Sequence, residues 1–111
     1  EEKQQFEIAK MYLNISDYKA AVTAFENLLH DFPDTKYREE SMYLLIKAKY
    51  YLAMNSIEAK KEQRIKDALN QYNLFNTSFP ESEFGGDAKS LNDKILKLQE
   101  DYLEDKKSKN N

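Results

Sequence analysis

The chain has 111 residues, of which 41% are hydrophobic and 33% charged, so it can build one small domain with a thin core. Its two glycines and two prolines are too few for the tight turns of an all-β fold, and we expect an all-α fold. A net charge of −3 gives no electrostatic reason to expect nucleic acid or an anionic membrane surface as a partner. The absence of cysteine excludes disulfides, thiolate metal sites and cysteine nucleophiles.

Apolar residues recur at helical spacings of three and four along most of the chain. Short polar segments and two Phe-Pro steps separate these runs, and the residue before a proline is held out of the α region. Asp17 is expected to cap the second run, and Asp34 or Thr35 the third. We therefore predict five helices, at about residues 4–15, 17–31, 35–54, 58–78 and 84–106.

The third predicted helix is apolar on two flanks, whereas a surface helix needs only one. Its first flank holds Ser41, Leu44, Leu45, Ala48, Tyr51 and Leu52. Its second flank holds Met42, Tyr43, Ile46, Tyr50 and Met54. This pattern predicts a middle element packed between neighbours before and after it, as in a stacked array of helical hairpins.

No apolar run reaches the length of a membrane span, because Lys47 and Lys49 interrupt the best candidate. The chain opens with Glu1-Glu2 rather than methionine, and we expect it to be a fragment of a longer protein. The single histidine, His30, has no serine, cysteine or second histidine at a recognisable catalytic spacing. We therefore expect no enzyme activity, no cofactor and no metal site.

Two segments of the chain, residues 17–41 and 64–88, align with a shift of 47 residues. The alignment pairs Lys19 with Lys66, Ala21 with Ala68, Phe25 with Tyr72, Leu28 with Phe75, and Phe32-Pro33 with Phe79-Pro80. The alanine lets two helices approach closely, the larger side chains fill the space beside it, and the proline enforces the turn into the next hairpin. Repeats of this kind bury their apolar faces only by stacking.

The small, aromatic, apolar and proline positions of the 34-residue tetratricopeptide motif are matched by Ala9, Tyr12, Ala21, Phe25, Leu28 and Pro33, so the chain resembles that family. The resemblance implies a right-handed solenoid of helical hairpins. We expect a first hairpin over residues 1–34, a second with lengthened helices and linker over 35–83, a capping helix over 84–107 and a disordered tail over 108–111.

The register of the second unit has two alternatives. We favour the one that equates Ala9 with Ala48 and places Tyr51 at the tyrosine position. A competing register uses Tyr43, Ile46, Lys47 and Tyr50 and would place a lysine at the small position.

A narrower resemblance rests on the run from Asp17 to Tyr37, the tyrosine-rich third helix, the polar linker after Met54, and Phe79-Pro-Glu-Ser82. In these features residues 5–100 resemble the C-terminal part of the BamD family of outer-membrane protein assembly lipoproteins, particularly its Bacteroidetes-type members. The resemblance implies a non-catalytic, lipid-anchored scaffold on the periplasmic side of the outer membrane. Its implied partners are the β-barrel subunit of the assembly complex and other lipoproteins, with no nucleic acid and no membrane contact beyond the anchor.

In tetratricopeptide arrays the first helix of each hairpin lines the concave face. The resemblance therefore implies a partner-binding surface made of Phe6, Lys10, Leu13, Asn14, Leu45, Lys49 and Leu52. Apolar residues beside lysines suit an extended or helical partner segment that bears carboxylates. Tyr51 is expected in the core, whereas Tyr43 and Tyr50 are expected at a surface that tyrosine suits for partner contact.

Two function classes follow from these patterns. The first is an interaction scaffold within the β-barrel assembly machinery of the outer membrane. The alternative is a peptide-binding tetratricopeptide domain of an unrelated regulatory or enzyme-associated protein.

Overall fold

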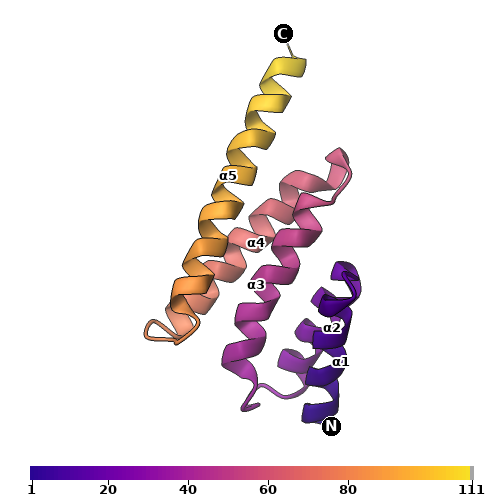
Figure 1. Cartoon of the computed structure of the whole chain (residues 1–111), viewed down its shortest axis with the longest axis vertical. Helices are drawn as coiled ribbons and strands as arrows, with labels where there is room; N and C mark the ends of the chain where they lie inside the picture. The colour runs from indigo at the N-terminus through magenta and orange to yellow at the C-terminus, as the bar shows by residue number, and fades with distance from the viewer. Residues whose placement is uncertain (111) are drawn as a thin grey trace.

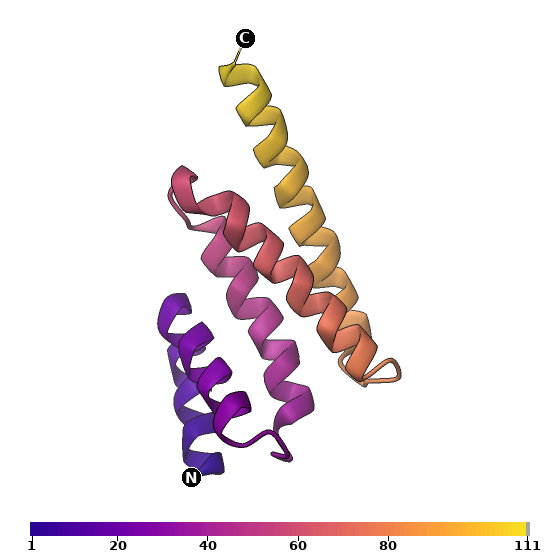
Figure 2. The same cartoon turned by 180° about the vertical axis from the view of Figure 1, so that it is seen from behind.

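The computed structural model describes residues 1–110, and these residues form five α-helices and no strand. The helices are α1 (Glu2–Asn14), α2 (Tyr18–Asp31), α3 (Arg38–Met54), α4 (Glu58–Ser78) and α5 (Gly85–Lys109). They form two antiparallel hairpins, α1–α2 and α3–α4, followed by α5, which packs on α3 and α4 (Figure 1, Figure 2). The predicted all-α fold with five helices is confirmed.

Side chains in the turn between α2 and α3 and in the turn between α4 and α5 set where α3 and α5 begin. Thr35 Oγ1 accepts a hydrogen bond from the Tyr37 amide at 3.2 Å, and Ser82 Oγ accepts one from the Phe84 amide at 3.0 Å. The predicted start of α3 at residue 35 is wrong because Thr35 stabilises the turn, so the helix begins only at Arg38. Asp17 does cap α2, since its Oδ1 accepts from the Ala20 amide at 3.2 Å.

The interior consists of two apolar clusters that meet at α3. The N-terminal core contains Phe6, Ala9, Ala21, Phe25, Leu28, Leu45 and Ala48. The C-terminal core contains Met42, Ile46, Ala53, Ile65, Ala68, Phe75, Ala88, Leu91 and Ile95. Leu45 and Ala48 come from the first predicted flank of α3, and Met42 and Ile46 from the second, so the two-sided burial of this helix is confirmed.

An aromatic stack at the start of each hairpin fixes how the two units correspond. Tyr37 stacks on Phe6 with ring centroids 4.5 Å apart, and Phe84 stacks on Tyr43 at 5.1 Å. Tyr37 and Phe84 are equivalent in the 47-residue alignment, so Phe6 corresponds to Tyr43, which lies 37 residues after it.

The favoured sequence register, which equated Ala9 with Ala48, is therefore wrong by two residues. With the 37-residue spacing Ala9 corresponds to Ile46, which lies in the C-terminal core against α4. Ala48 instead packs in the N-terminal core against the preceding hairpin. A two-residue error rotates a helical side chain by about 200° around the axis, to the opposite side of the helix.

Helix α5 covers the open side of the second hairpin through Ala88, Leu91 and Ile95. It continues to Lys109, beyond the predicted end of the capping helix. The extension is tied to the start of α4, because Lys109 Nζ lies 2.9 Å from Glu58 Oε1 and Lys106 Nζ lies 4.0 Å from Glu62 Oε1. Asn111, the end of the predicted tail, lies outside the described residues.

The two motif alanines give a stability test of this packing. Ala21 and Ala68 are both 0% exposed, so Ala21→Leu and Ala68→Leu should each lower the free energy of unfolding by about 1–3 kcal/mol through overpacking. Urea denaturation followed by circular dichroism measures the change. Ala59→Leu, on the exposed first turn of α4, is the matched control. Unchanged stability in both core variants would contradict the packing described above.

Substitution of Ser41 should raise the free energy of unfolding, whereas the two alanine substitutions should lower it. Its side chain is 0% exposed, and its Oγ has no hydrogen-bond partner among the described residues. The equivalent position in α5, 47 residues later, carries Ala88. Ser41→Ala removes an unsatisfied buried hydroxyl and should raise the free energy of unfolding by up to about 1 kcal/mol. Exposed Ser90→Ala serves as the control in the same urea titration, and a clear loss of stability in Ser41→Ala would disprove the prediction.

Candidate functional site

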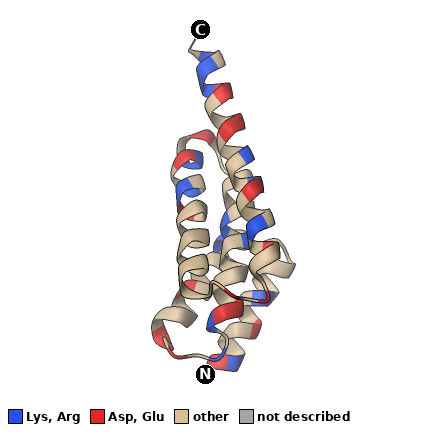
Figure 3. Ribbon diagram, turned by 90° about the vertical axis from the view of Figure 1, so that its left-hand side faces the viewer, with Lys and Arg blue, Asp and Glu red and all other residues tan. Residues whose placement is uncertain are grey.

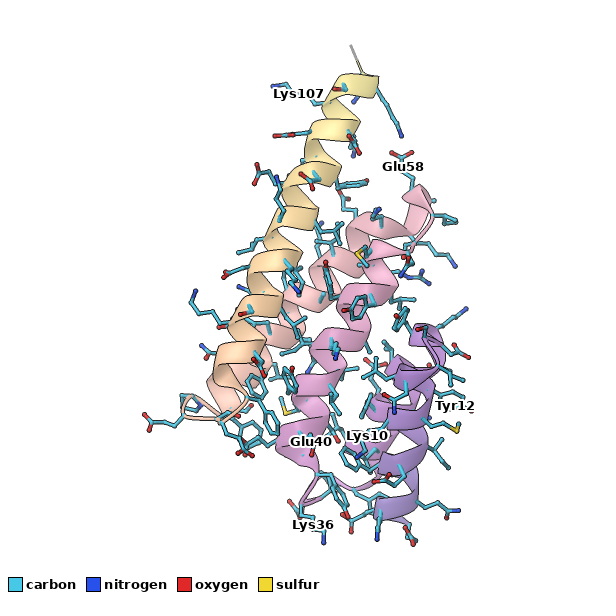
Figure 4. All side chains as sticks on the ribbon, viewed as in Figure 1. Lys10, Tyr12, Lys36, Glu40, Glu58 and Lys107 are labelled. Carbon is cyan, nitrogen blue, oxygen red and sulfur yellow. The ribbon has the colours of Figure 1, made fainter. Side chains whose placement is uncertain are left out.

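A groove of about 400 Å³ runs between the first helices of the two hairpins. We call it the α1–α3 groove, and its walls are Lys10, Leu13, Asn14, Tyr18, Glu40, Leu44, Lys47 and Tyr51. Figure 4 labels Lys10 and Glu40, which come from the two facing helices. The groove lining therefore combines two lysines, one carboxylate, one amide, two leucines and two tyrosines.

Three of the seven predicted binding residues, Lys10, Leu13 and Asn14, line this groove. Phe6 and Leu45 do not, because each is 2% exposed and belongs to the N-terminal core. Phe6 nevertheless supports the groove wall, since Lys10 Nζ lies 4.6 Å from the centroid of its ring. This cation–π contact, together with Glu7 Oε1 at 3.4 Å, holds the Lys10 side chain along α1.

The remaining two predicted residues, Lys49 and Leu52, lie on the other side of α3. They line a separate hollow of about 240 Å³ with residues of α2 and α4. Lys49 Nζ lies 3.3 Å from Glu26 Oε2 of α2 and donates to Gln71 Oε1 of α4 at 3.1 Å. Its side chain is 15% exposed, so Lys49 joins the two hairpins and does not share a surface with Lys10.

The sequence prediction missed the α3 side of the groove because of the two-residue register error. The residues that correspond to Lys10 and Asn14 at the 37-residue spacing are Lys47 and Tyr51, and both line the groove. Tyr51 was expected in the core, but its ring stacks on Tyr18 at 5.1 Å and forms part of the groove wall. The match of Phe6 with Tyr43 and of Lys10 with Lys47 at a spacing of 37 residues is the sequence signal that could have located these residues.

Tyr43 lies on the part of α3 that faces α5. Its ring is stacked on Phe84, and burial, followed by the negative charge of Asp87, raises the pKa of its hydroxyl. Tyr43, expected at a free surface, is instead partly buried against the C-terminal core.

His30 is exposed at the end of α2, with Nδ1 3.3 Å from Asp31 Oδ1. No three or more histidine or carboxylate side chains within residues 1–110 are grouped as a metal site would require. No helix formed by these residues combines the length and apolar character needed to span a bilayer.

A comparison with models of protein families gives a match. The family model YfiO, described as outer membrane lipoprotein, matches residues 1–101, which include all of α1 to α4 and most of α5. No curated protein matches the chain. The family match confirms the resemblance to BamD-like outer-membrane lipoproteins that the sequence patterns implied. Because the match covers nearly the whole chain, this protein belongs to the YfiO family of outer membrane lipoproteins.

Proposed function

We propose that this chain is a non-catalytic interaction scaffold of the outer-membrane β-barrel assembly machinery, on the periplasmic side of the membrane. Its partners are the β-barrel subunit of that machinery and other lipoproteins. The family match supports this function over the alternative of an unrelated regulatory or enzyme-associated domain. The single observation that carries the scaffold role is the α1–α3 groove, which is shaped by side chains suited to binding a polypeptide segment.

The chemistry of the groove specifies the kind of segment it fits. Lys10 of α1 and Lys47 of α3 both line the groove and attract carboxylates. Leu13 and Leu44 offer apolar contact, and Tyr51 adds a large ring that loses little entropy on binding. We infer a partner segment in which acidic residues flank an apolar one.

Glu40 gives the segment a direction. It lies near the start of α3, about two helical turns before Lys47, and repels carboxylates at that end of the groove. An acidic residue of the partner is favoured beside Lys47, and a neutral or basic one is favoured beside Glu40. The charges therefore select one orientation of the bound segment over its reverse.

The double variant Lys10→Glu and Lys47→Glu tests this site. It should slow association with the purified periplasmic domains of the β-barrel subunit by about tenfold at low salt, because steering by both lysines is reversed. Surface plasmon resonance measures the rate. Helical content should stay unchanged, since both lysines are partly exposed at the groove.

The matched control is Lys19→Glu with Lys66→Glu, which changes the net charge equally on exposed positions of α2 and α4. It should leave the association rate close to that of the unmodified chain. Equal slowing by both double variants would indicate a general charge effect and would remove the α1–α3 groove as the binding site. Failure of the unmodified chain to bind would contradict the scaffold proposal itself.

A further inference from the structure

The hollow on the α2 and α4 side of α3 shares no residue with the α1–α3 groove, and we call it the α2–α4 hollow. Helices α1 and α3 lie toward the viewer in Figure 1, and α2 and α4 do so in Figure 2, so the groove and the hollow lie on opposite sides of α3. The volume of the hollow, about 240 Å³, equals that of about eight water molecules. Its walls are Val22, Glu26, Lys49, Leu52, Arg64 and Asp67.

Arg64 is held in the wall of this hollow without a carboxylate partner. Its Nη1 donates to Ser56 Oγ at 2.8 Å, and Ser56 Oγ donates to the Leu52 carbonyl oxygen at 2.5 Å. The side chain is half-buried and forms no ion pair within residues 1–110. A guanidinium has five N–H donors, and its planar fork matches the two oxygens of a carboxylate. Arg64 is therefore oriented in advance for an anionic group that the chain itself does not supply.

The other three charged side chains of the hollow already have partners. Lys49 Nζ lies 3.3 Å from Glu26 Oε2 and 3.1 Å from Gln71 Oε1. Asp67 Oδ1 accepts from Gln63 Nε2 at 2.9 Å on the exposed edge of α4. The negative charge of Asp67 repels a second acid, so the hollow admits a single carboxylate, beside the free guanidinium.

The apolar part of the hollow consists of Val22 and Leu52. Both side chains are half-buried, and Leu52 contributes to neither of the two apolar cores. An aliphatic side chain placed against them would remove apolar surface from water. The hollow thus offers one carboxylate position next to one aliphatic position.

The internal repeat shows that stacking of the hairpins does not require these charges. At the 47-residue spacing, the hollow residues of α2 and α3 correspond to uncharged residues of α4 and α5: Val22, Glu26, Lys49 and Leu52 correspond to Leu69, Asn73, Leu96 and Gln99. Charges of both signs occupy other positions of α5 (Figure 3). Helix α5 nevertheless packs on α4 as α3 packs on α2. The charged lining is therefore particular to the α2–α4 hollow.

We propose that the α2–α4 hollow is a second docking site, which binds a partner polypeptide through one acidic and one aliphatic side chain. The acid accepts hydrogen bonds from Arg64, and the aliphatic side chain packs on Val22 and Leu52. The hollow is too small for a helix about 10 Å across, so the bound segment is extended, and the two side chains are two positions apart because alternate residues face the same side. The site is independent of the function proposed for the α1–α3 groove.

A peptide titration of the full chain tests the proposal. The probe is acetyl-Leu-Ser-Asp-Ser-Leu-amide, which places a leucine two positions from the acid in either chain direction. Nuclear magnetic resonance should show saturable shifts of the Arg64 Nε–H signal and of the Val22 and Leu52 methyl signals, with a Kd of about 1 mM. Replacing the aspartate of the peptide by asparagine, or both leucines by serine, should weaken binding by about tenfold.

Variants of the chain locate the bound carboxylate. Arg64→Gln should weaken binding of the peptide by about tenfold, and Arg64→Lys by about threefold, because lysine keeps the charge but loses the planar fork. Lys66→Gln makes the same change of charge as Arg64→Gln at an exposed position of α4 and should leave Kd unchanged. The double variant Lys10→Glu and Lys47→Glu should also leave it unchanged, so the result does not depend on the α1–α3 groove. Circular dichroism checks that each variant is folded, and Arg64→Lys decides the outcome if Arg64→Gln is not.

Four results would overturn the proposal. One is the absence of saturable shifts at Arg64 up to about 10 mM peptide. Another is equal binding of the aspartate and asparagine peptides. The third is an unchanged Kd in the folded Arg64 variants. The fourth is a set of shifts centred on Lys10 and Lys47, which would place the peptide in the α1–α3 groove.

Discussion

The structure depends on the burial of α3 on two sides. Leu45 and Ala48 complete the N-terminal core, and Met42 and Ile46 complete the C-terminal core. Neither hairpin has enough apolar surface to enclose its own interior, because each core takes residues from more than one hairpin or from α5. The two cores are therefore joined through one helix, and displacement of α3 would open both.

A polar contact supplements this apolar packing between the hairpins. Lys49 extends from α3 between Glu26 of α2 and Gln71 of α4. Gln71 is 6% exposed, and without the Lys49 ammonium its amide oxygen would lose its hydrogen bond in a buried place. The contact therefore links α2 and α4 through a side chain of α3.

The positions of the helices could be predicted from the sequence because apolar spacing, Asp17 and the two Phe-Pro steps each act locally. The two apolar flanks of α3 could be predicted for the same reason. The rotation of α3 relative to its neighbours could not be predicted, because Ala48 suits close approach to either hairpin. A two-residue error in register places a side chain on the opposite side of the helix. Lys10, Leu13 and Asn14 were found because the first unit keeps the motif spacing. Lys47 and Tyr51 were missed because the second unit does not.

The arrangement of neighbours also determines how the chain can fold. The principal helix pairs in the described residues are α1–α2, α2–α3, α3–α4, α4–α5 and α3–α5, so every partner lies at most two helices away along the chain. Contacts of short sequence separation cost little loop-closure entropy and favour rapid folding. The first hairpin acquires Leu45 and Ala48 only when α3 is present, and the second acquires Leu91 and Ile95 only with α5. During synthesis from the N-terminus, each core is therefore completed by the helix that follows it.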